Sequence, residues 1–143
     1  MPTSYCHLAT HIIFSTKERY RFITNEIKDD LQHYIGGIIN NHHGQSIIVG
    51  GTNDHVHILC LLPKEMSIAE FVRSIKSNSS KWAHEKYRVE FAWQTGYAAF
   101  AVSKSNVESV RNYVLNQEEH HKKESFQVEF DKFMKAHGYT NNE

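Results

Sequence analysis

Two histidines, His55 and His57, stand two positions apart in an apolar, β-branched segment of the chain. Residues two apart in a β-strand project from the same face of the sheet, so a strand here brings both imidazoles to one side. Neutral imidazoles placed in this way can hold a divalent cation and leave coordination positions open for a substrate oxygen, which suits metal-assisted attack on a phosphodiester. The chain has 11 histidines among 143 residues, so a His-x-His pair arises by chance about once, and its surroundings must decide its meaning.

A second candidate group lies further along the chain, on a segment whose apolar stripe is formed by Val107, Val110 and Val114. Helical geometry puts Tyr113 and Gln117 one turn apart on one flank of that stripe. A phenol is a weak nucleophile at its usual pKa of about 10, but beside a cation that polarises a phosphate it can attack and form a phosphotyrosine. The flank would have to face the histidine pair, of the same or a neighbouring subunit. Without that pair, Tyr113 is more simply a core-edge tyrosine and Gln117 a surface glutamine.

Four strands and four helices are predicted to position these residues. Alternating and β-branched runs predict the strands, and apolar residues at helical spacing predict the helices. Their order begins strand, helix, strand, strand, helix, strand, which is the ferredoxin-like plan of the α+β class: an antiparallel sheet with two helices on one face and the other face left for function. The strands are expected at residues 5–16, 46–49, 55–62 and 97–103, and the helices at about 24–40, 67–84, 105–121 and 126–139.

Capping and turn residues support these boundaries. Ser67 is expected to cap the second helix, and Ser105 with Glu108 is expected to form a capping box at the start of the third. The segment Gly50–Asp54 suits a tight turn between two paired strands. The histidine pair therefore belongs to the second strand of a hairpin.

Length and composition predict one compact domain, residues 1–143, without room for a second domain of ordinary size. The 16 basic residues balance the 16 acidic ones, so any site for nucleic acid must be a local patch. The chain has no apolar run long enough for a membrane span, and residues 1–4 lack the basic start of a signal peptide, so a cytosolic protein is expected. Cys6 and Cys60 have no CxxC spacing and are expected to be reduced thiols.

One face of the second helix is basic and rich in hydroxyl groups, and it could bind phosphates. A solvated helix face is the ordinary alternative. The candidate DNA contacts on this face are Arg73, Lys76 and Lys81.

Other histidines are given ordinary interpretations. The adjacent pairs His42-His43 and His120-His121 should diverge from each other and are not expected to bind metal. His7 and His11 lie on the first strand, where sheet packing is the simpler interpretation and support of the histidine pair is the alternative.

Three features together resemble the single-tyrosine transposases of the HUH superfamily, named for histidine, a bulky hydrophobic residue and histidine. They are Asp54-His55-Val56-His57, the spacing from Tyr113 to Gln117, and the segment from Trp93 to Ser103. These small enzymes move simple insertion sequences as single-stranded DNA. The resemblance covers almost the whole chain, and the order and spacing of the features make it specific.

The resemblance implies a cation site and a nucleophile. His55, His57 and Gln117 would bind Mg²⁺ or Mn²⁺, and Tyr113 would attack the scissile phosphate to give a 5′-phosphotyrosine and a free 3′-hydroxyl. It also implies a homodimer in which each active site joins the histidine pair of one subunit to the tyrosine helix of the other. The DNA partner would be a single strand with short hairpins near the element ends, in the prokaryotic cytosol or nucleoid.

Several alternatives stay open at this point. A related HUH nickase, such as a replication initiator or relaxase, is usually part of a larger protein. A domesticated transposase would act on repeated palindromes of its host. A non-catalytic ferredoxin-like module would bind single strands by stacking and basic contacts. A metal-dependent hydrolase of small phosphates would need more acidic ligands than Asp54, which as a strand neighbour of His55 points to the opposite face.

Overall fold

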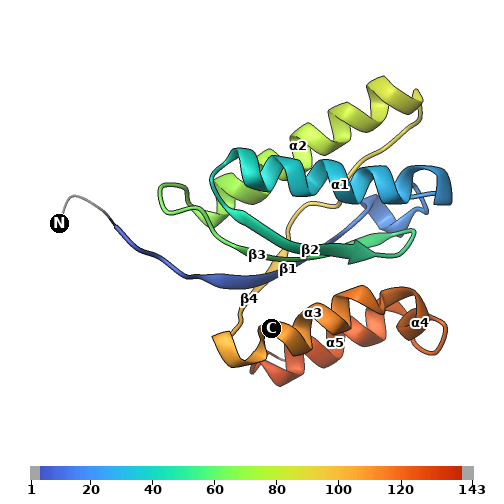
Figure 1. The fold of residues 1–143 in the computed structure, drawn as a ribbon. Helices are drawn as coiled ribbons and strands as arrows, with labels where there is room; N and C mark the ends of the chain where they lie inside the picture. The colour runs from blue at the N-terminus through green and yellow to red at the C-terminus, as the bar shows by residue number, and fades with distance from the viewer. Residues whose placement is uncertain (1–3, 140–143) are drawn as a thin grey trace.

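A computed structural model describes residues 4–139, so the prediction about the N-terminal segment rests partly on residues outside the described range. Four antiparallel strands form one sheet in the order β2-β3-β1-β4. Helices cover both of its faces, with α1 and α2 on one side and α3, α4 and α5 on the other (Figure 1). The strands are β1 (Ala9–Ser15), β2 (Gln45–Gly51), β3 (His55–Leu61) and β4 (Ala98–Ala101), and the helices are α1 (Asn25–Asn41), α2 (Ile68–Tyr87), α3 (Val107–Leu115), α4 (Gln117–His121) and α5 (Phe126–Ala136), with 3-10 turns η1 (Lys17–Arg19) and η2 (Lys104–Asn106).

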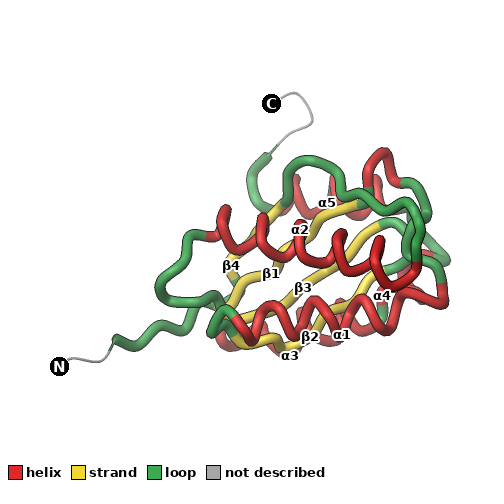
Figure 2. The backbone as a smooth tube through the Cα atoms, turned by 90° about the horizontal axis from the view of Figure 1, so that it is seen from above, coloured by secondary structure: helices red, strands yellow, loops and turns green. Residues whose placement is uncertain are grey.

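This arrangement confirms the predicted α+β, ferredoxin-like class. The two helices of the first layer, α1 and α2, lie side by side across the sheet when it is viewed from above (Figure 2). Ser67 caps α2 as predicted, because its hydroxyl accepts a hydrogen bond from the Glu70 amide. Within the described residues, no helix is long and apolar enough to cross a membrane.

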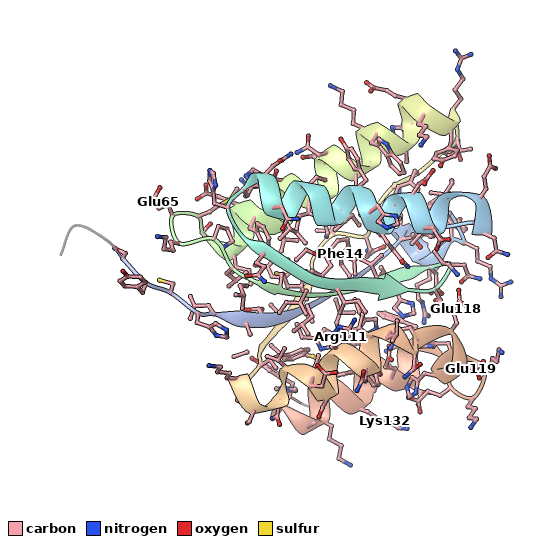
Figure 3. The ribbon with its side chains drawn as sticks, viewed as in Figure 1. Phe14, Glu65, Arg111, Glu118, Glu119 and Lys132 are labelled. Atoms are coloured by element: carbon pink, nitrogen blue, oxygen red, sulfur yellow. The ribbon has the colours of Figure 1, made fainter. Side chains whose placement is uncertain are left out.

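The central strands β1 and β3 divide their side chains between two different environments. Residues at alternate positions face α1 and α2 and form the apolar core, and Phe14 points into that layer in Figure 3. Their neighbours face α3, α4 and α5. The strand period therefore places His11, His55 and His57 together on the second face. The core on the first face includes Ile12, Phe14, Ile27, Leu31, Ile35, Val56, Ile58, Phe71 and Ile75.

The third predicted helix differs from the prediction at its start and in its interior, while its end at His121 agrees. The 3-10 turn η2 precedes it, so α3 begins at Val107, and Ser105 bonds to Ser103 rather than forming the predicted capping box. The helix then breaks at Asn116, whose side-chain amide donates to the carbonyl of Asn112 at 2.9 Å. The Asn116 backbone amide donates to the same carbonyl at 3.1 Å, and local side-chain bonds of this kind make asparagine common at helix ends. The predicted segment 105–121 is therefore two helices, α3 and α4.

Candidate active site

His55 and His57 lie on β3 and are fully buried beneath the second helical layer. Each imidazole is held through its Nδ1 atom. Asp54 Oδ1 lies 2.8 Å from His55 Nδ1, contrary to the expected opposite direction, because β3 begins at His55 and Asp54 belongs to the turn before it. His11 Nε2 lies 2.8 Å from His57 Nδ1. Such supporting contacts fix ring orientation and tautomer, and they are typical of histidines that bind metal. Both Nε2 atoms are left facing α3, α4 and α5. His11 therefore supports His57, which was the alternative to plain sheet packing.

The structure brings Tyr113 and Gln117 to this histidine pair within one chain. Gln117 Oε1 lies 3.0 Å from His55 Nε2, and the ring centroid of Tyr113 lies 5.8 Å from that of His57. The helix break at Asn116 falls between the two residues, yet both side chains reach the same point. All four predicted site residues converge, while their roles stay predictions.

Two residues outside the predicted set also enter the site, namely Glu129 from α5 and His121 from α4. Glu129 Oε1 lies 3.0 Å from His57 Nε2, 3.1 Å from His121 Nε2 and 3.7 Å from His55 Nε2. Its Oε2 accepts hydrogen bonds from the Gln117 amide at 3.0 Å and from the Tyr113 hydroxyl. One buried carboxylate thus touches both the histidine cluster and the candidate nucleophile.

The sequence held a signal for one of these two residues. Glu129 shares a face of α5 with Phe126 and Phe133, where an acidic side chain is out of place unless it has buried partners. No comparable signal marked His121. The adjacent pair His120-His121 does not diverge from the site as expected, because His121 Nε2 lies 3.1 Å from Glu129 Oε1 and His120 Nε2 lies 3.5 Å from Glu129 Oε2.

Aromatic rings of α5 cover the histidines. The Phe126 ring stacks on His55 with centroids 4.2 Å apart and an interplanar angle of 9°. Phe133 lies edge-on to His11 at 5.3 Å and to Tyr113 at 5.5 Å. The side chain of Ser125 caps α5 at its start by accepting from the Val128 amide. The apolar face of α5 therefore shields the site from solvent.

Burial sets the charges in this site. It lowers the pKa of His57 to about 4 and the pKa of His11 to about 3, so both imidazoles are neutral at pH 7. Burial opposes the charge of Glu129, but hydrogen bonds from His57, Tyr113 and Gln117 outweigh it and hold the pKa of that carboxyl well below its usual range. Burial and the Glu129 carboxylate raise the pKa of the Tyr113 phenol. The site thus contains a carboxylate, neutral imidazoles and a protonated phenol.

Acidification is expected to destabilise the protein in a chelating buffer. Between pH 6.5 and about 4, the unfolded chain binds a proton at His57 that the folded protein does not, so stability falls as pH falls through this window. The loss is about 1.4 kcal/mol for each unit of difference in pKa. Urea unfolding at several pH values measures it. His11→Gln should weaken the dependence, because His11 has the same kind of shift, whereas the exposed control His33→Gln should not. Equal stability at pH 7 and pH 5 would contradict the expectation.

The candidate DNA contacts Arg73, Lys76 and Lys81 lie on α2, on the opposite side of the sheet from this site (Figure 1). Arg73 and Lys81 are exposed. The Lys76 ammonium donates to the carbonyls of Gln94, at 2.7 Å, and Gly96. Lys76 thereby holds the loop before β4, and DNA contact by all three residues stays a prediction.

Two clefts flank Phe126. One, of about 380 Å³, lies between β1, the loop before β4 and α5, and Tyr97 and Phe130 are among its lining residues. The other, of about 430 Å³, has Arg21 and Lys122 among its lining residues. Arg19 borders both. Each cleft has the size of a small-molecule site, and Phe126, which stacks on His55, lines both. The sequence patterns did not point to these arginines.

The profile of one protein family, described as "Transposase IS200 like", matches residues 4–117. The chain belongs to the IS200-like transposase family. The match covers most of the chain and includes the histidine pair, Tyr113 and Gln117. Membership confirms the resemblance to the single-tyrosine HUH transposases and implies DNA cleavage and transfer. His121 and Glu129 lie beyond the matched segment.

Relatives of known name agree with this membership of the IS200-like family. The ISDra2 transposase TnpA of Deinococcus radiodurans is 25% identical over 117 residues, which are 77% of this chain and 84% of that protein. The transposase of the insertion sequence IS200 from Salmonella typhimurium is 26% identical over 119 residues, 78% of each chain.

Two solved structures share the fold of this IS200-like transposase. A crystal structure described as that of a transposase from Deinococcus radiodurans has a TM-score of 0.65 at 21% identity, covering 82% of this chain and 96% of that one. A REP-associated tyrosine transposase, solved bound to a REP hairpin, has a TM-score of 0.58 at 15% identity, covering 88% and 74%. At these sequence identities, the similarity supports a shared fold and nothing more specific.

Proposed function

We propose that this transposase cleaves and rejoins single-stranded DNA at hairpin-marked element ends through a 5′-phosphotyrosine on Tyr113. The observation that carries the proposal is the convergence of the Tyr113 hydroxyl, the paired imidazoles and the Gln117 amide within one buried site. A protein of the same fold was solved with a hairpin bound, which supports the choice of DNA partner. The proposed place of action is the prokaryotic cytosol or nucleoid, where such DNA lies.

The donor set around His55 fits a divalent cation. With its proton on Nδ1, where Asp54 Oδ1 lies 2.8 Å away, His55 would present a lone pair at Nε2. The Gln117 amide nitrogen donates a hydrogen bond to Glu129. The Gln117 amide oxygen, which is an acceptor, therefore faces His55 Nε2 at 3.0 Å. In that tautomer two acceptors face each other, and a divalent cation would bind both. We therefore propose that His55, His57 and Gln117 hold Mg²⁺ or Mn²⁺.

The reaction is a transesterification at one phosphate. Such a cation, when bound, polarises the phosphate and lowers the cost of ionising a nearby phenol. The Tyr113 oxygen forms a bond to phosphorus, the bond from phosphorus to the 3′-oxygen breaks, and the phenol's proton ends on that 3′-oxygen. The 5′-phosphate stays on Tyr113, and the reverse reaction rejoins the strand. The rings of Phe126 and Phe133 exclude water, which protects the covalent link from hydrolysis.

The test is incubation with a labelled single-stranded hairpin and Mn²⁺ or Mg²⁺, followed by denaturing electrophoresis and mass spectrometry of tryptic peptides. A DNA adduct on the peptide that carries Tyr113 is the expected result. Tight hairpin binding without any adduct would contradict the proposal and favour the non-catalytic binding module.

Close packing of α3 on the sheet holds Tyr113 in place, and it requires a glycine. A Cβ atom at Gly50 on β2 would lie 2.7 Å from the Val114 carbonyl oxygen. Gly50→Ala is therefore expected to push α3 outward, to cost about 1–3 kcal/mol of stability, and to slow strand cleavage at least about tenfold. Gly37→Ala is the matched control, because nothing lies within 4 Å of its added Cβ. Equal cleavage rates in the two variants would contradict this role of Gly50.

We also propose that two chains associate, as the resemblance implies. The edge strands β2 and β4 present unpaired backbone groups that a second chain could cover. Sedimentation should give a species of twice 16.6 kDa at micromolar protein, and a monomer alone would contradict it. Tyr113 lies beside His57 of its own chain, so mixing His57→Gln chains with Tyr113→Phe chains tests for shared sites. Cleavage by the mixture would require exchange of the tyrosine helix.

A further inference from the structure

Four possible metal-donor atoms converge in the site. Two of them belong to residues of the proposed cation site, and two do not. The four atoms belong to His55, His57, His121 and Glu129, and all lie within 4.8 Å of one another. Metal bonds of about 2.1 Å put opposite ligand atoms about 4.2 Å apart. Shifts of a few tenths of an ångström for each donor would bring all four to a common cation. The Glu129 Oε1 atom already lies within 3.1 Å of two imidazole nitrogens.

The charge of Glu129 calls for a positive partner that the protein does not provide. Glu129 is buried, with 2% of its surface exposed. Among residues 4–139, only histidines lie within ion-pair distance of it, and no lysine or arginine does. A buried carboxylate without a permanent positive partner is costly. The hydrogen bonds from His57, Tyr113 and Gln117 stabilise this carboxylate but bring no permanent positive charge, and a divalent cation held by the same cluster would supply one.

We propose that His121 and Glu129 complete the cation site, and that three imidazoles and one carboxylate, beside the Gln117 amide oxygen, select Mn²⁺ over Mg²⁺. This inference rests on the proposed cation site at His55 and His57. Imidazole nitrogen suits transition-metal ions, while Mg²⁺ prefers an oxygen environment and keeps several waters. Both added ligands lie beyond residue 117, outside the segment shared with the family profile.

Binding of Mn²⁺ to the full chain can be measured directly, without the cleavage reaction, by electron paramagnetic resonance. Glu129→Gln and His121→Asn should each weaken Mn²⁺ binding at least about tenfold. The exposed controls Glu119→Gln and His33→Asn should bind Mn²⁺ like wild type. Pulsed measurements should detect three imidazole nitrogens on Mn²⁺ in wild type and two in His121→Asn. Mg²⁺ should compete at least tenfold less tightly than Mn²⁺.

A further variant separates loss of a ligand from loss of folding. Glu129→Asp keeps a carboxylate and should recover part of the Mn²⁺ affinity that Glu129→Gln loses. The inference would be overturned if only two imidazole nitrogens were detected on Mn²⁺ in wild type and if Glu129→Gln and His121→Asn bound Mn²⁺ with full affinity. The proposed function would then be left intact. If wild type binds neither ion, the inference and the proposed cation requirement fail together. A DNA adduct on Tyr113 formed in the presence of chelator would then show that Tyr113 is the nucleophile and needs no cation.

Discussion

Replacing Tyr113 by phenylalanine should abolish strand cleavage, by at least about 10³-fold, while hairpin binding persists. The substitution removes only the hydroxyl that would form the bond to phosphorus. The ring keeps its contacts with His57 and Phe133, so the fold should be retained. Gel assays of product formation and of hairpin binding, done on the same preparation, measure the two effects separately.

Tyr87→Phe is the matched control for this prediction. It also removes one tyrosine hydroxyl and one hydrogen bond to a carboxylate, that of Asp30, but it lies on α2 in the other helical layer. Its cleavage rate should equal that of wild type. A covalent adduct that still forms in Tyr113→Phe, on any other residue, would show that the nucleophile has been assigned wrongly.

Loss of one histidine of the pair should be nearly as damaging. His57→Gln is expected to lower the cleavage rate at least about 10²-fold, because it removes a proposed cation ligand and breaks the contact with His11. Chelation of wild type should have the same effect and be reversed by added Mn²⁺. His33→Gln, on the exposed face of α1, should follow wild type in both conditions, losing cleavage on chelation and recovering it with added Mn²⁺.

The two arms of this experiment have separate meanings. Cleavage by chelated wild type at its usual rate would contradict a cation requirement. Full activity of His57→Gln with Mn²⁺ present would contradict the ligand role of His57. Thermal melts of the variant check that the change at a fully buried position has not unfolded the sheet.

Much of the fold followed from local patterns in the sequence. The strand period alone put His55 and His57 on one face, and alternate residues such as Val56 and Ile58 on the other. Helical spacing located α1 and α2 because each needs one apolar face against the sheet. The order of elements then limited the topology to a few arrangements, of which the observed one is the ferredoxin-like sheet.

The rest depended on contacts between distant segments. Glu129 and His57 are 72 positions apart, and no local pattern says which face of α5 meets which strand. The break falls at Asn116, whose side chain and backbone amide both bond the Asn112 carbonyl, and apolar spacing does not reveal it. Lys76 fits a basic ridge by spacing, yet its ammonium is bonded to loop carbonyls that only tertiary structure brings near.

The two helical layers are held to the sheet with unequal strength, and this has a consequence for how the protein opens. Helices α1 and α2 bury nine apolar residues between them, whereas α3, α4 and α5 fully bury one, Val114, together with Gln117 and Glu129. Regions with few buried apolar contacts open at a lower free energy than the global unfolding transition. Amide hydrogens of the second layer should therefore exchange with solvent well before those of β1 and β3. Under the proposed function, such local opening would give a DNA strand access to the histidines at a cost below that of unfolding, and reclosure would enclose the strand with them.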